Sequence, residues 1–414
     1  MMNRERFWKH TAVMAVAALL LGSCAAPPTR PEGTQRGPNL SQSLTAGSGV
    51  ISPYKASNGS DDATFANQKI VKVGLLLPLT GRNAELGRAL QDAATVSLFD
   101  KYARLSLRQQ TVRVELLPKD TGDTPEQAAR AAEQAVADGV AFIIGPLFAD
   151  ATSSAAPFAR AQNISVLSLS NTRTQASPGT YMFGFSPAEQ ADRVVSYAIA
   201  SGKPRVAVLA PNGPLGDIVL TAAREAATRQ GFQLAGEARY LAQGAGIDTA
   251  LNSLVQAGKP PNFDAILIPE GGTTLDTILR GLNSRGVSPT NVKFLGTGLW
   301  DDADLLRRVN LDSAWVASSP PELTSQFDAR FRETYKYAPP RIASLTYDAV
   351  ALTVTLATSG RAFDTATLTN AGGYAGPANG IFRLRADGQV QRGLAVMQVY
   401  GGSLKVVSPA PSSF

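Results

Sequence analysis

The sequence has few of the side chains that most enzymes use for catalysis. Its 414 residues contain one cysteine, Cys24, and one histidine, His10. If residues 1–23 are a leader that is removed, the mature chain has no histidine for a Ser-His triad or for acid–base chemistry. The shortage also excludes a cysteine nucleophile, the usual zinc sites and disulfide bonds. We therefore expect a protein that is not an enzyme and needs no cofactor.

Patterns for binding nucleotides and nucleic acids are also missing. No Gly-x-Gly-x-x-Gly follows a predicted strand, there is no Walker-type phosphate loop, and Gly296-Thr297-Gly298 is too short to replace either. The formal net charge is +6, but the lysines and arginines are scattered and form no run. A nucleic acid partner is therefore not expected.

The first 23 residues are typical of a lipoprotein signal peptide. A basic start is followed by the short apolar stretch Thr11–Leu21 and then by Leu21-Gly22-Ser23-Cys24, which matches a lipobox. We expect cleavage before Cys24 and lipidation of its thiol, which would anchor the protein on the periplasmic side of a bacterial membrane. Ala25, in place of Asp, favours the outer membrane if the host has two. The alternative is a plain signal peptide with an incidental cysteine.

Residues 24–68 are rich in Pro, Gly, Ser, Thr and Asn and show almost no apolar periodicity. This composition predicts a flexible tether, and a coil of about 40 residues would span roughly 35 Å. We expect it to bury almost nothing, so that the ordered core begins near Lys69. The alternative is a terminus without a function.

From Lys69 onwards, strand and helix patterns alternate. Ile70–Leu77 is a nearly continuous apolar run, which predicts a strand buried on both faces. A capping box of Thr124 and Gln127 predicts a helix start after the second strand. The alternation continues to about residue 295 and predicts an α/β fold with a doubly wound parallel sheet in each half. Near the C-terminus, Asp387-Gly388 predicts a hairpin turn between Gly380 and Val399.

Four stretches resemble the type I periplasmic solute-binding proteins, the leucine/isoleucine/valine-binding family. They are "PLTG…GRALQDAA", "FIIGPLFADATSSAAPFA", "NISVLSLSNT" and "TSQFDARFRETYKYAPPRIASLTYDAVAL". The resemblance covers about Lys69 to Leu404. It implies two α/β lobes joined by a hinge of three crossings, with a ligand in the cleft. We expect the first lobe to comprise 69–185 plus 318–375, and the second 186–317 plus 376–414.

In such sheets, ligands gather where the parallel strands end. Position after a strand, together with the resemblance, gives a set of expected ligand-binding residues in the two lobes. In the first lobe they are Thr80, Asn83, Phe148, Asp150, Thr152, Ser168, Ser170 and Asn171. In the second lobe they are Asn212, Glu270, Thr273 and Trp300. The N–H groups at the start of the helix near Asp150 would face a carboxylate or another anion.

The sequence departs from the amino-acid-binding members of the resembled family at three places. Ala149 stands where they have a serine, Leu215 where they have an aromatic residue, and Gly298 where they have an acid for the ligand's ammonium group. Burying the charged ends of an amino acid without these groups would be costly. Glu270, from the neighbouring strand, is a possible substitute for the missing acid. We expect leucine-like amino acids to bind weakly or not at all.

Several of these residues also have structural interpretations. Asp150 and Ser170 suit helix caps. Glu270, which precedes two glycines, suits a solvated turn, and Trp300 suits the core or the hinge. Asp301, Asp302 and Asp304 begin a helix, where acids commonly face the helix dipole, so we expect no metal site.

Two functions remain open from the sequence. One is a lipid-anchored receptor that captures a small polar ligand and delivers it to an ABC permease or a sensor. The other is an outer-membrane lipoprotein that activates a peptidoglycan-synthesising penicillin-binding protein, as one branch of the resembled family does. The family likeness favours the receptor. The activator is favoured by the tether, by Ala25 and by the departures at Ala149, Leu215 and Gly298 from the residues that hold an amino acid.

Overall fold

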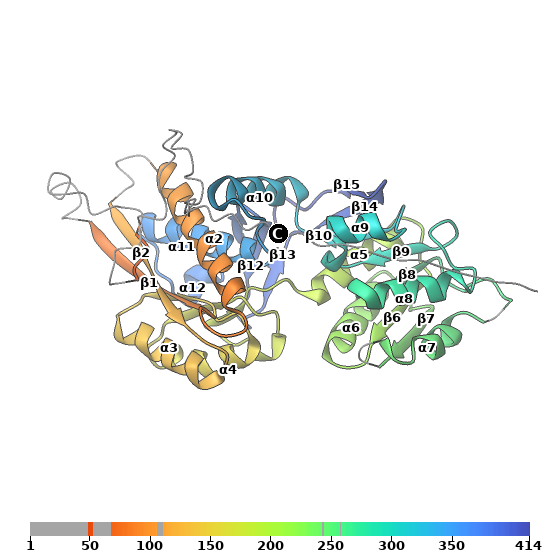
Figure 1. Cartoon of the computed structure of the whole chain (residues 1–414), viewed down its shortest axis with the longest axis horizontal. Helices are drawn as coiled ribbons and strands as arrows, with labels where there is room; N and C mark the ends of the chain where they lie inside the picture. Colours follow the sequence, from red (N-terminus) through yellow and green to blue (C-terminus); the bar gives the residue numbers. More distant parts are fainter. Residues whose placement is uncertain (1–48, 53–67, 106–110, 242–243, 257) are drawn as a thin grey trace, which may run out of the picture. The chain divides into compact units, whose positions relative to one another are not determined.

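A computed structural model gives the fold of the chain (Figure 1). It describes residues 49–52, 68–105, 111–241, 244–256 and 258–414. The expected signal peptide, Cys24 and most of the expected tether lie outside the described residues. In the described part of the chain, no helix has both the length and the apolar character needed to cross a bilayer.

The first lobe is built on a sheet of five parallel strands in the order β2-β1-β3-β4-β5. These strands are β1 (Lys69–Leu77), β2 (Val112–Asp120), β3 (Phe142–Ile144), β4 (Ser165–Ser168) and β5 (Thr180–Met182). Along β1, Val73 and Leu75 belong to one buried cluster and Leu76 belongs to another. Both faces of the sheet are therefore covered, which explains the continuous apolar run in the sequence.

Helices cover both faces of this sheet. They are α2 (Ala84–Ala103), α3 (Pro125–Ala137), α4 (Ala149–Ala161), α10 (Pro321–Tyr335), α11 (Ala343–Thr358) and the short α12 (Thr365–Leu368). The packing clusters place α2 and α11 on one face and α3 and α4 on the other. The predicted capping box is confirmed, because Thr124 Oγ1 accepts from Gln127 N and Gln127 Oε1 accepts from Thr124 N.

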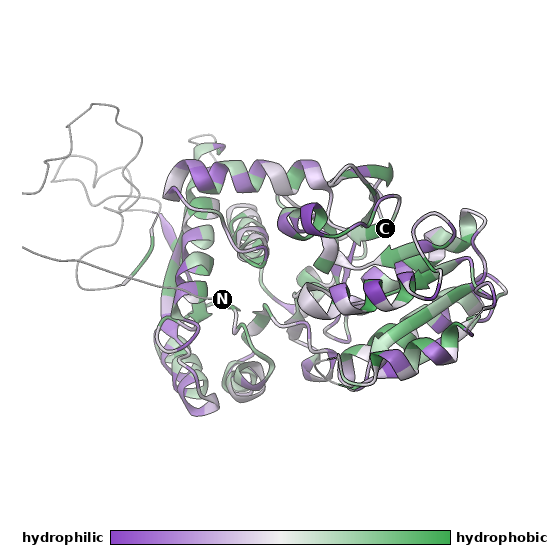
Figure 2. Ribbon diagram, turned by 45° about the vertical axis from the view of Figure 1, so that its right-hand side comes forward, coloured by the Kyte–Doolittle hydropathy of each residue, from purple (hydrophilic) through white to green (hydrophobic). Residues whose placement is uncertain are grey.

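The second lobe is built on a sheet of seven strands in the order β15-β14-β10-β9-β8-β6-β7. They are β6 (Val206–Pro211), β7 (Gly236–Tyr240), β8 (Ala265–Leu267), β9 (Lys293–Gly296), β10 (Trp315–Ser318), β14 (Ala395–Tyr400) and β15 (Ser403–Ser408). The pairs from β7 to β10 are parallel, whereas β14 and β15 add an antiparallel edge. Figure 2 shows the strands as mostly hydrophobic and the helices as mixed.

The helices of the second lobe also lie on both faces of its sheet. They are α5 (Pro187–Ala200), α6 (Pro214–Arg229), α7 (Ile247–Leu254), α8 (Gly272–Asn283) and α9 (Ala303–Arg308). One buried cluster joins α5 and α6 to the sheet, and another joins α7, α8 and α9 to its opposite face. This two-faced covering is the doubly wound arrangement that the alternating pattern predicts.

A small antiparallel sheet corrects the expected assignment of the C-terminal residues. It consists of β11 (Tyr374–Gly376), β12 (Gly380–Leu384) and β13 (Val390–Arg392). The hairpin turns at Asp387-Gly388 as predicted, but its second arm ends at Arg392 and does not run from Gly393 to Val399. Phe382 and Val390 pack into the core of the first lobe. The last crossing therefore follows β13, and not residue 375, where we expected the first lobe to end.

The expectation that the tether buries almost nothing is also wrong at Ile51 and at its neighbour Val50, which packs against the first-lobe core. Ile51 is 1% exposed and belongs to the first-lobe core. It exchanges two backbone hydrogen bonds with Leu116, of 2.9 and 3.0 Å. Since β2 is an edge strand of the sheet, Ile51 covers an edge that would otherwise be open. The ordered part of the fold thus includes a contact well before Lys69.

Candidate functional site

Two of the predicted binding residues lie together inside the first lobe. Thr152 and Ser168 are fully buried, and their hydroxyl oxygens are 2.7 Å apart. Thr152 Oγ1 lies 2.8 Å from the carbonyl oxygen of Phe148, and Ser168 Oγ lies 3.1 Å from that of Pro146. One of the two hydroxyls donates to its carbonyl and the other donates to the neighbouring hydroxyl. These hydroxyls therefore join the start of α4 to the end of β4.

The residues after β4 also bond to the protein itself. Ser170 is 6% exposed, and its Oγ accepts from Thr172 N at 3.2 Å. Asn171 is exposed, and its Nδ2 donates to the carbonyl of Phe185 at 3.1 Å. The second bond links the end of the strand to the first crossing between the lobes.

At the start of α4, Phe148 and Asp150 are exposed. The Asp150 carboxylate accepts from the N–H of Ala151 at 2.8 Å, and Phe148 occupies the N-cap position without a side-chain hydrogen bond. The helix-cap interpretation of Asp150 is therefore wrong, because Phe148 is the N-cap residue and Asp150 lies in the first turn of the helix, where an acid faces the helix dipole. Phe148 presents an aromatic ring to solvent beside this helix start.

The loop after β1 is organised by Asp120, a residue that the sequence analysis did not select. The Asp120 carboxylate accepts from Leu79 N at 2.8 Å and from Thr80 Oγ1 at 2.5 Å. Burial acts against ionisation, but the hydrogen bonds from Thr80, Gly122 and Leu79 outweigh it and hold the pKa of Asp120 below its ordinary value. Thr80 thus fixes the loop, and its hydroxyl already has a partner.

In the second lobe, Trp300 is a core residue. It is 0% exposed, and its Nε1 donates to the carbonyl of Glu270 at 2.7 Å. A Cβ at Gly296 would lie 2.2 Å from its ring, so the glycine is what makes room for the indole. Tyr240 Oη donates to the Glu270 carboxylate, which holds this acid at the end of β8.

Two further predicted residues of the second lobe are exposed. Asn212 follows β6, and its backbone N–H donates to the carbonyl of Tyr240 at 2.7 Å. Thr273 lies in the first turn of α8, where its carbonyl accepts from Thr277 Oγ1 at 3.1 Å. Their side chains remain accessible at the strand-end edge of this sheet.

The structure adds a residue to this region that the sequence analysis missed, Arg341. It precedes α11, whose first residues belong to the first-lobe core, yet its guanidinium reaches the second lobe. A Cβ at Gly298 would lie 2.5 Å from Arg341 Nη2, and the same nitrogen donates to Ser318 Oγ at 2.8 Å. A cation just before a helix is unfavourable because the N-terminal end of the helix dipole is positive. This unfavourable position was the one feature of the sequence that could have marked Arg341 as a functional residue.

The surroundings of Arg341 combine an aromatic ring with an acid. Its guanidinium lies 4.3 Å from the centre of the Phe185 ring. Ser318 Oγ donates to Asp301 at 2.8 Å. Burial lowers the pKa of Arg341, and the charge of Asp301 acts in the opposite direction. Gly298 is the position where the resembled amino-acid-binding proteins have an acid, so here a cation lies against the place of that acid.

A buried polar network lies beside the crossings. Asp348 is 0% exposed and accepts hydrogen bonds from Ala378 N, Asn379 N and Asn379 Nδ2 at 2.8, 3.1 and 2.8 Å. Burial raises the pKa of Asp348 to about 6. Ser319 Oγ donates to Asn379 Oδ1 at 3.0 Å, which joins the segment after β10 to the segment before β12.

Arg392 and Glu189 form another buried polar contact near the crossings. The backbone N–H of Arg392 donates to Glu189 Oε1 at 3.1 Å, and Arg392 Nη2 donates to the carbonyl of Phe183 at 2.6 Å. Burial raises the pKa of Glu189 to about 7, although the charges of Arg392 and Arg173 oppose the rise. The pair connects α5 of the second lobe to the last strand of the small sheet.

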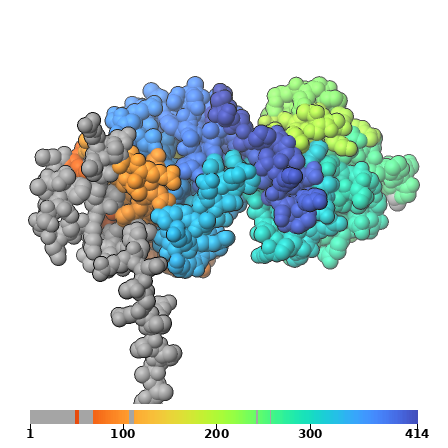
Figure 3. Space-filling view, turned by 90° about the horizontal axis from the view of Figure 1, so that it is seen from above, coloured from red at the N-terminus to blue at the C-terminus, as the bar shows by residue number. Residues whose placement is uncertain are grey.

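Asn83 lines a hollow of about 730 Å³ on the first lobe. The hollow lies between the start of α2 and residues 337–340, and Figure 3 shows α2 and α10 side by side on this surface. Tyr337 is 41% exposed, and its Oη donates to Asp92 at 2.7 Å. Arg82, Arg88 and the acid Glu85 also belong to the polar part of the lining. An exposed tyrosine beside arginines is a composition enriched at protein interfaces.

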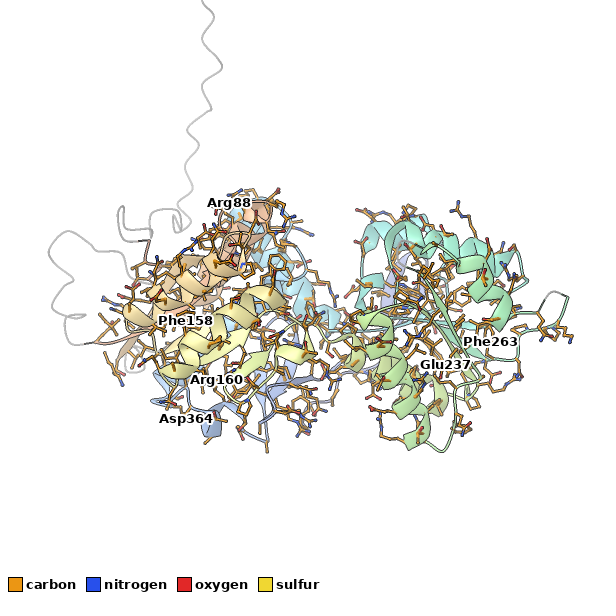
Figure 4. The ribbon with its side chains drawn as sticks, turned by 90° about the horizontal axis from the view of Figure 1, so that it is seen from below. Arg88, Phe158, Arg160, Glu237, Phe263 and Asp364 are labelled. Carbon is orange, nitrogen blue, oxygen red and sulfur yellow. The ribbon has the colours of Figure 1, made fainter. Side chains whose placement is uncertain are left out.

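A smaller hollow of about 410 Å³ lies elsewhere on the first lobe. Arg160 of α4 and Asp364, which caps α12, both line it, and Figure 4 labels both. Arg160 donates to Ser177 Oγ at 2.9 Å. This hollow contains none of the predicted binding residues.

Residues 70–403 match the family model described as periplasmic binding protein. The chain belongs to the periplasmic binding protein family. This assignment covers both lobes and agrees with the resemblance seen in the sequence. The family and the fold are those of binding proteins.

Solved structures of this family share the fold at low identity. A branched-chain amino acid ABC transporter ligand-binding protein from Burkholderia xenovorans has a TM-score of 0.66 and 18% identity, covering 83% of this chain and 96% of that chain. An ABC transporter solute-binding protein from Rhodopseudomonas palustris, in complex with 3,4-dihydroxybenzoic acid, has a TM-score of 0.60 and 21% identity, covering 83% of this chain and 97% of that chain.

A curated relative has another role. The penicillin-binding protein activator LpoA of Pectobacterium parmentieri is 28% identical over 209 residues, which is 50% of this chain. The match covers 29% of the relative's own length, so the matched part of this chain corresponds to less than a third of that protein.

Proposed function

We propose that this chain is an extracytoplasmic interaction protein that activates a peptidoglycan-synthesising penicillin-binding protein. The observation that carries the proposal is the position of Arg341. Its guanidinium lies against Gly298, where the resembled amino-acid-binding proteins hold the ligand's ammonium group. An ammonium there would meet a like charge, and Arg341 already bonds across the lobes to Ser318.

Two further observations support this function. The hydroxyls of Thr152, Ser168 and Thr80, which we expected to bind a ligand, are bonded to protein atoms. The similarity to a penicillin-binding protein activator extends over half of this chain. A surface that binds a protein does not need a filled cleft, and the exposed Tyr337 with Arg82 and Arg88 suits such a contact.

The proposal includes the lipid anchor at Cys24. Lipidation there would hold the folded part near the membrane, and Ala25 favours the outer one if the host has two. We expect the wild-type protein to fractionate with membranes and Cys24→Ala to be soluble or retained with its leader. A wild-type protein that is soluble and begins at another residue would contradict the anchor.

A pull-down tests the interaction itself. Residues 49–414 are immobilised, and the purified extracytoplasmic parts of the host's peptidoglycan synthases are passed over them one at a time. We expect one synthase to be retained, and retention to fall in Tyr337→Ala but not in Tyr400→Ala, a tyrosine that is 74% exposed. Failure of every synthase to bind would reject the proposal.

The second candidate function is a receptor that passes a small carboxylate to an ABC permease. Arg341 favours it, since a half-buried guanidinium beside Phe185 could pair with a carboxylate and stack on its ring. The Rhodopseudomonas palustris structure holds 3,4-dihydroxybenzoic acid. A bound ligand should stabilise the fold by about 2.7 kcal/mol at a hundredfold excess over Kd. A thermal-shift screen of aromatic and aliphatic carboxylates would detect it, and a shift lost in Arg341→Ala would favour the receptor.

A further inference from the structure

A hollow of about 520 Å³ lies beside α5, next to the last crossing between the lobes. Its walls come from α5, from the strands β12 and β13, and from the residues that follow β15. Hydrogen bonds join these walls directly, because Arg193 Nε donates to the carbonyl of Leu394 at 2.9 Å and Arg193 Nη2 donates to Ser408 Oγ at 2.6 Å. The hollow contains none of the binding residues that the sequence predicts.

Two arginines of this hollow have no acid to pair with. Arg193 and Arg383 are half-buried, and neither forms an ion pair with a carboxylate in the described part of the chain. All the hydrogen bonds of the two guanidinia go to uncharged acceptors, which are backbone carbonyls, Ser408 Oγ and Gln391 Oε1. Both positive charges are therefore left without a counter-charge.

Each of the two guanidinia also has a nitrogen that a ligand can reach. Arg193 Nη1 and Arg383 Nη2 form no hydrogen bond among the described residues, and neither is one of the buried polar atoms without a partner. The side chains are fixed at Leu394 and Gln391, three residues apart, and three residues of chain span about 10 Å at most. One small ligand can thus contact both donors.

Three more charged groups line the hollow, and the balance of charge stays positive. Arg392 is 5% exposed, and its Nε and Nη1 have no partner among the described residues, so it acts on the hollow through its charge. Asp192 forms an ion pair with Arg229, which lies outside the lining. Burial raises the pKa of Glu189 to about 7, so this carboxyl is only partly ionised near neutral pH. An anion held between the arginines would be stabilised by this excess of positive charge.

We propose that this hollow binds the phosphate group of a phosphomonoester. Two guanidinia from separate segments suit a tetrahedral group with three acceptor oxygens and a charge near −2, whereas one guanidinium is enough for a planar carboxylate. Leu394, Pro409 and the Phe414 ring, which lies 4.8 Å from the Arg383 guanidinium, give an apolar wall for the esterified group. The volume lies in the range of small-molecule sites, about 300–1,000 Å³. The site is separate from the hollow around Tyr337 that we propose for the synthase.

Calorimetry with phenyl phosphate tests the proposal on residues 49–414, which include every residue of the four buried clusters. We expect phenyl phosphate to bind, and phenyl sulfate, which has the same shape but one negative charge, to bind about tenfold more weakly. Arg383→Gln should weaken binding of phenyl phosphate about tenfold, because one charge-assisted hydrogen-bonded pair is lost. Arg385→Gln is the matched control, since Arg385 belongs to the same hairpin, pairs with Asp387 and does not line this hollow.

Three outcomes would overturn the inference. They are no heat of binding with phenyl phosphate at millimolar ligand, equal affinity for phenyl phosphate and phenyl sulfate, and equal binding of phenyl phosphate by Arg383→Gln and Arg385→Gln. Arg193→Gln is a second test of the same site and should also weaken binding about tenfold. Each variant is first checked for an unchanged thermal transition, and if Arg193→Gln does not fold, Arg383→Gln alone decides.

A vesicle experiment identifies the kind of molecule that carries the phosphate. Residues 49–414 lack Cys24, so they can sediment with vesicles only through the folded surface. Retention on vesicles of phosphatidylcholine and phosphatidic acid, but not of phosphatidylcholine alone, would assign the site to a lipid headgroup if Arg383→Gln abolishes it. Binding of phenyl phosphate without retention on either vesicle would assign the site to a soluble phosphate ester. Both results support a phosphate site.

Discussion

The guanidinium of Arg341 and the hydroxyl of Ser318 are joined by a hydrogen bond of 2.8 Å. The bond connects the start of α11, which packs in the first lobe, to the end of β10 in the second sheet. Since Ser318 Oγ also donates to Asp301, the cation and the acid are linked through one hydroxyl. The hydrogen-bonded series Arg341–Ser318–Asp301 therefore connects the two lobes through side chains, without a bound ligand.

Removing this link should loosen the second lobe beside it. In Arg341→Ala we expect faster amide hydrogen exchange at residues 297–301, because a charge-assisted hydrogen bond worth about 1.5–3 kcal/mol is lost. Arg307→Ala, on the exposed face of α9, serves as the control. Exchange that is the same in both variants and in the wild type would mean that the bond does not hold the lobes.

The docking of Ile51 on β2 predicts that part of the expected tether stabilises the fold. Ile51→Ala should lower the free energy of unfolding by about 2 kcal/mol, since a buried isoleucine is truncated in a packed core. The matched control is Ile70→Ala, an isoleucine of the adjacent strand β1 that is 45% exposed and should change stability by about 0.5 kcal/mol or less. Urea unfolding of residues 49–414 measures both. Equal effects of the two substitutions would contradict the docking.

The raised pKa of Glu189 predicts a pH dependence of stability. Burial raises its pKa to about 7, against about 4.3 in the unfolded chain, so the folded protein binds the proton more tightly between these values. Its contribution to stability is therefore greatest at low pH and is lost as the pH rises towards 7. Glu189→Gln, which keeps an acceptor for Arg392 N, should reduce this fall.

Glu225→Gln is the control for this pH dependence, because Glu189 and Glu225 line one hollow beside α6 and Glu225 is exposed on that helix. Denaturant unfolding at a series of pH values from 4 to 7 gives the two slopes. The interpretation would be wrong if the Glu189→Gln variant kept the slope of the wild type.

The hydrogen bond between Tyr337 and Asp92 predicts a local effect in the hollow beside α2. Tyr337→Phe should lower stability by about 1 kcal/mol, because Asp92 loses the donor that opposes the burial-raised pKa of its carboxyl group. Tyr400→Phe, at a site 74% exposed, should change little. Thermal unfolding of both variants at neutral pH checks this, and an unchanged transition in Tyr337→Phe would show that the bond is not made in solution.

Much of the fold could be predicted because local and tertiary preferences agree. The apolar run of β1 is buried on both faces, and the capping box at Thr124 begins α3 as the sequence indicates. The third crossing was misplaced in the sequence analysis. The alternation of apolar and polar residues in β12 and β13 indicates that the two strands pair, but it does not indicate which lobe's core their apolar side chains join. Ile51 was missed since two adjacent apolar residues, Val50 and Ile51, in a polar stretch show no period.

The candidate site was less predictable than the fold. Ser168 and Glu270 lie at the ends of strands, as the order of elements in the sequence predicts. The sequence could not show that their side-chain oxygens already form hydrogen bonds with other protein atoms. Arg341 was missed because it comes from a helix start remote in sequence from the strand ends, and only the tertiary structure brings it against Gly298. Trp300 fits the core interpretation because Gly296 leaves room for its ring.

The measurement that tests the central claim most directly is the rate of peptidoglycan synthesis by the retained synthase, with and without residues 49–414. If the chain acts by protein contact, the rate should rise several-fold and reach a plateau at equimolar protein. Small carboxylates should leave this effect unchanged, and Tyr337→Ala should weaken it. An unchanged rate, together with a carboxylate-dependent thermal shift that Arg341→Ala abolishes, would contradict the account and identify the chain as a solute receptor.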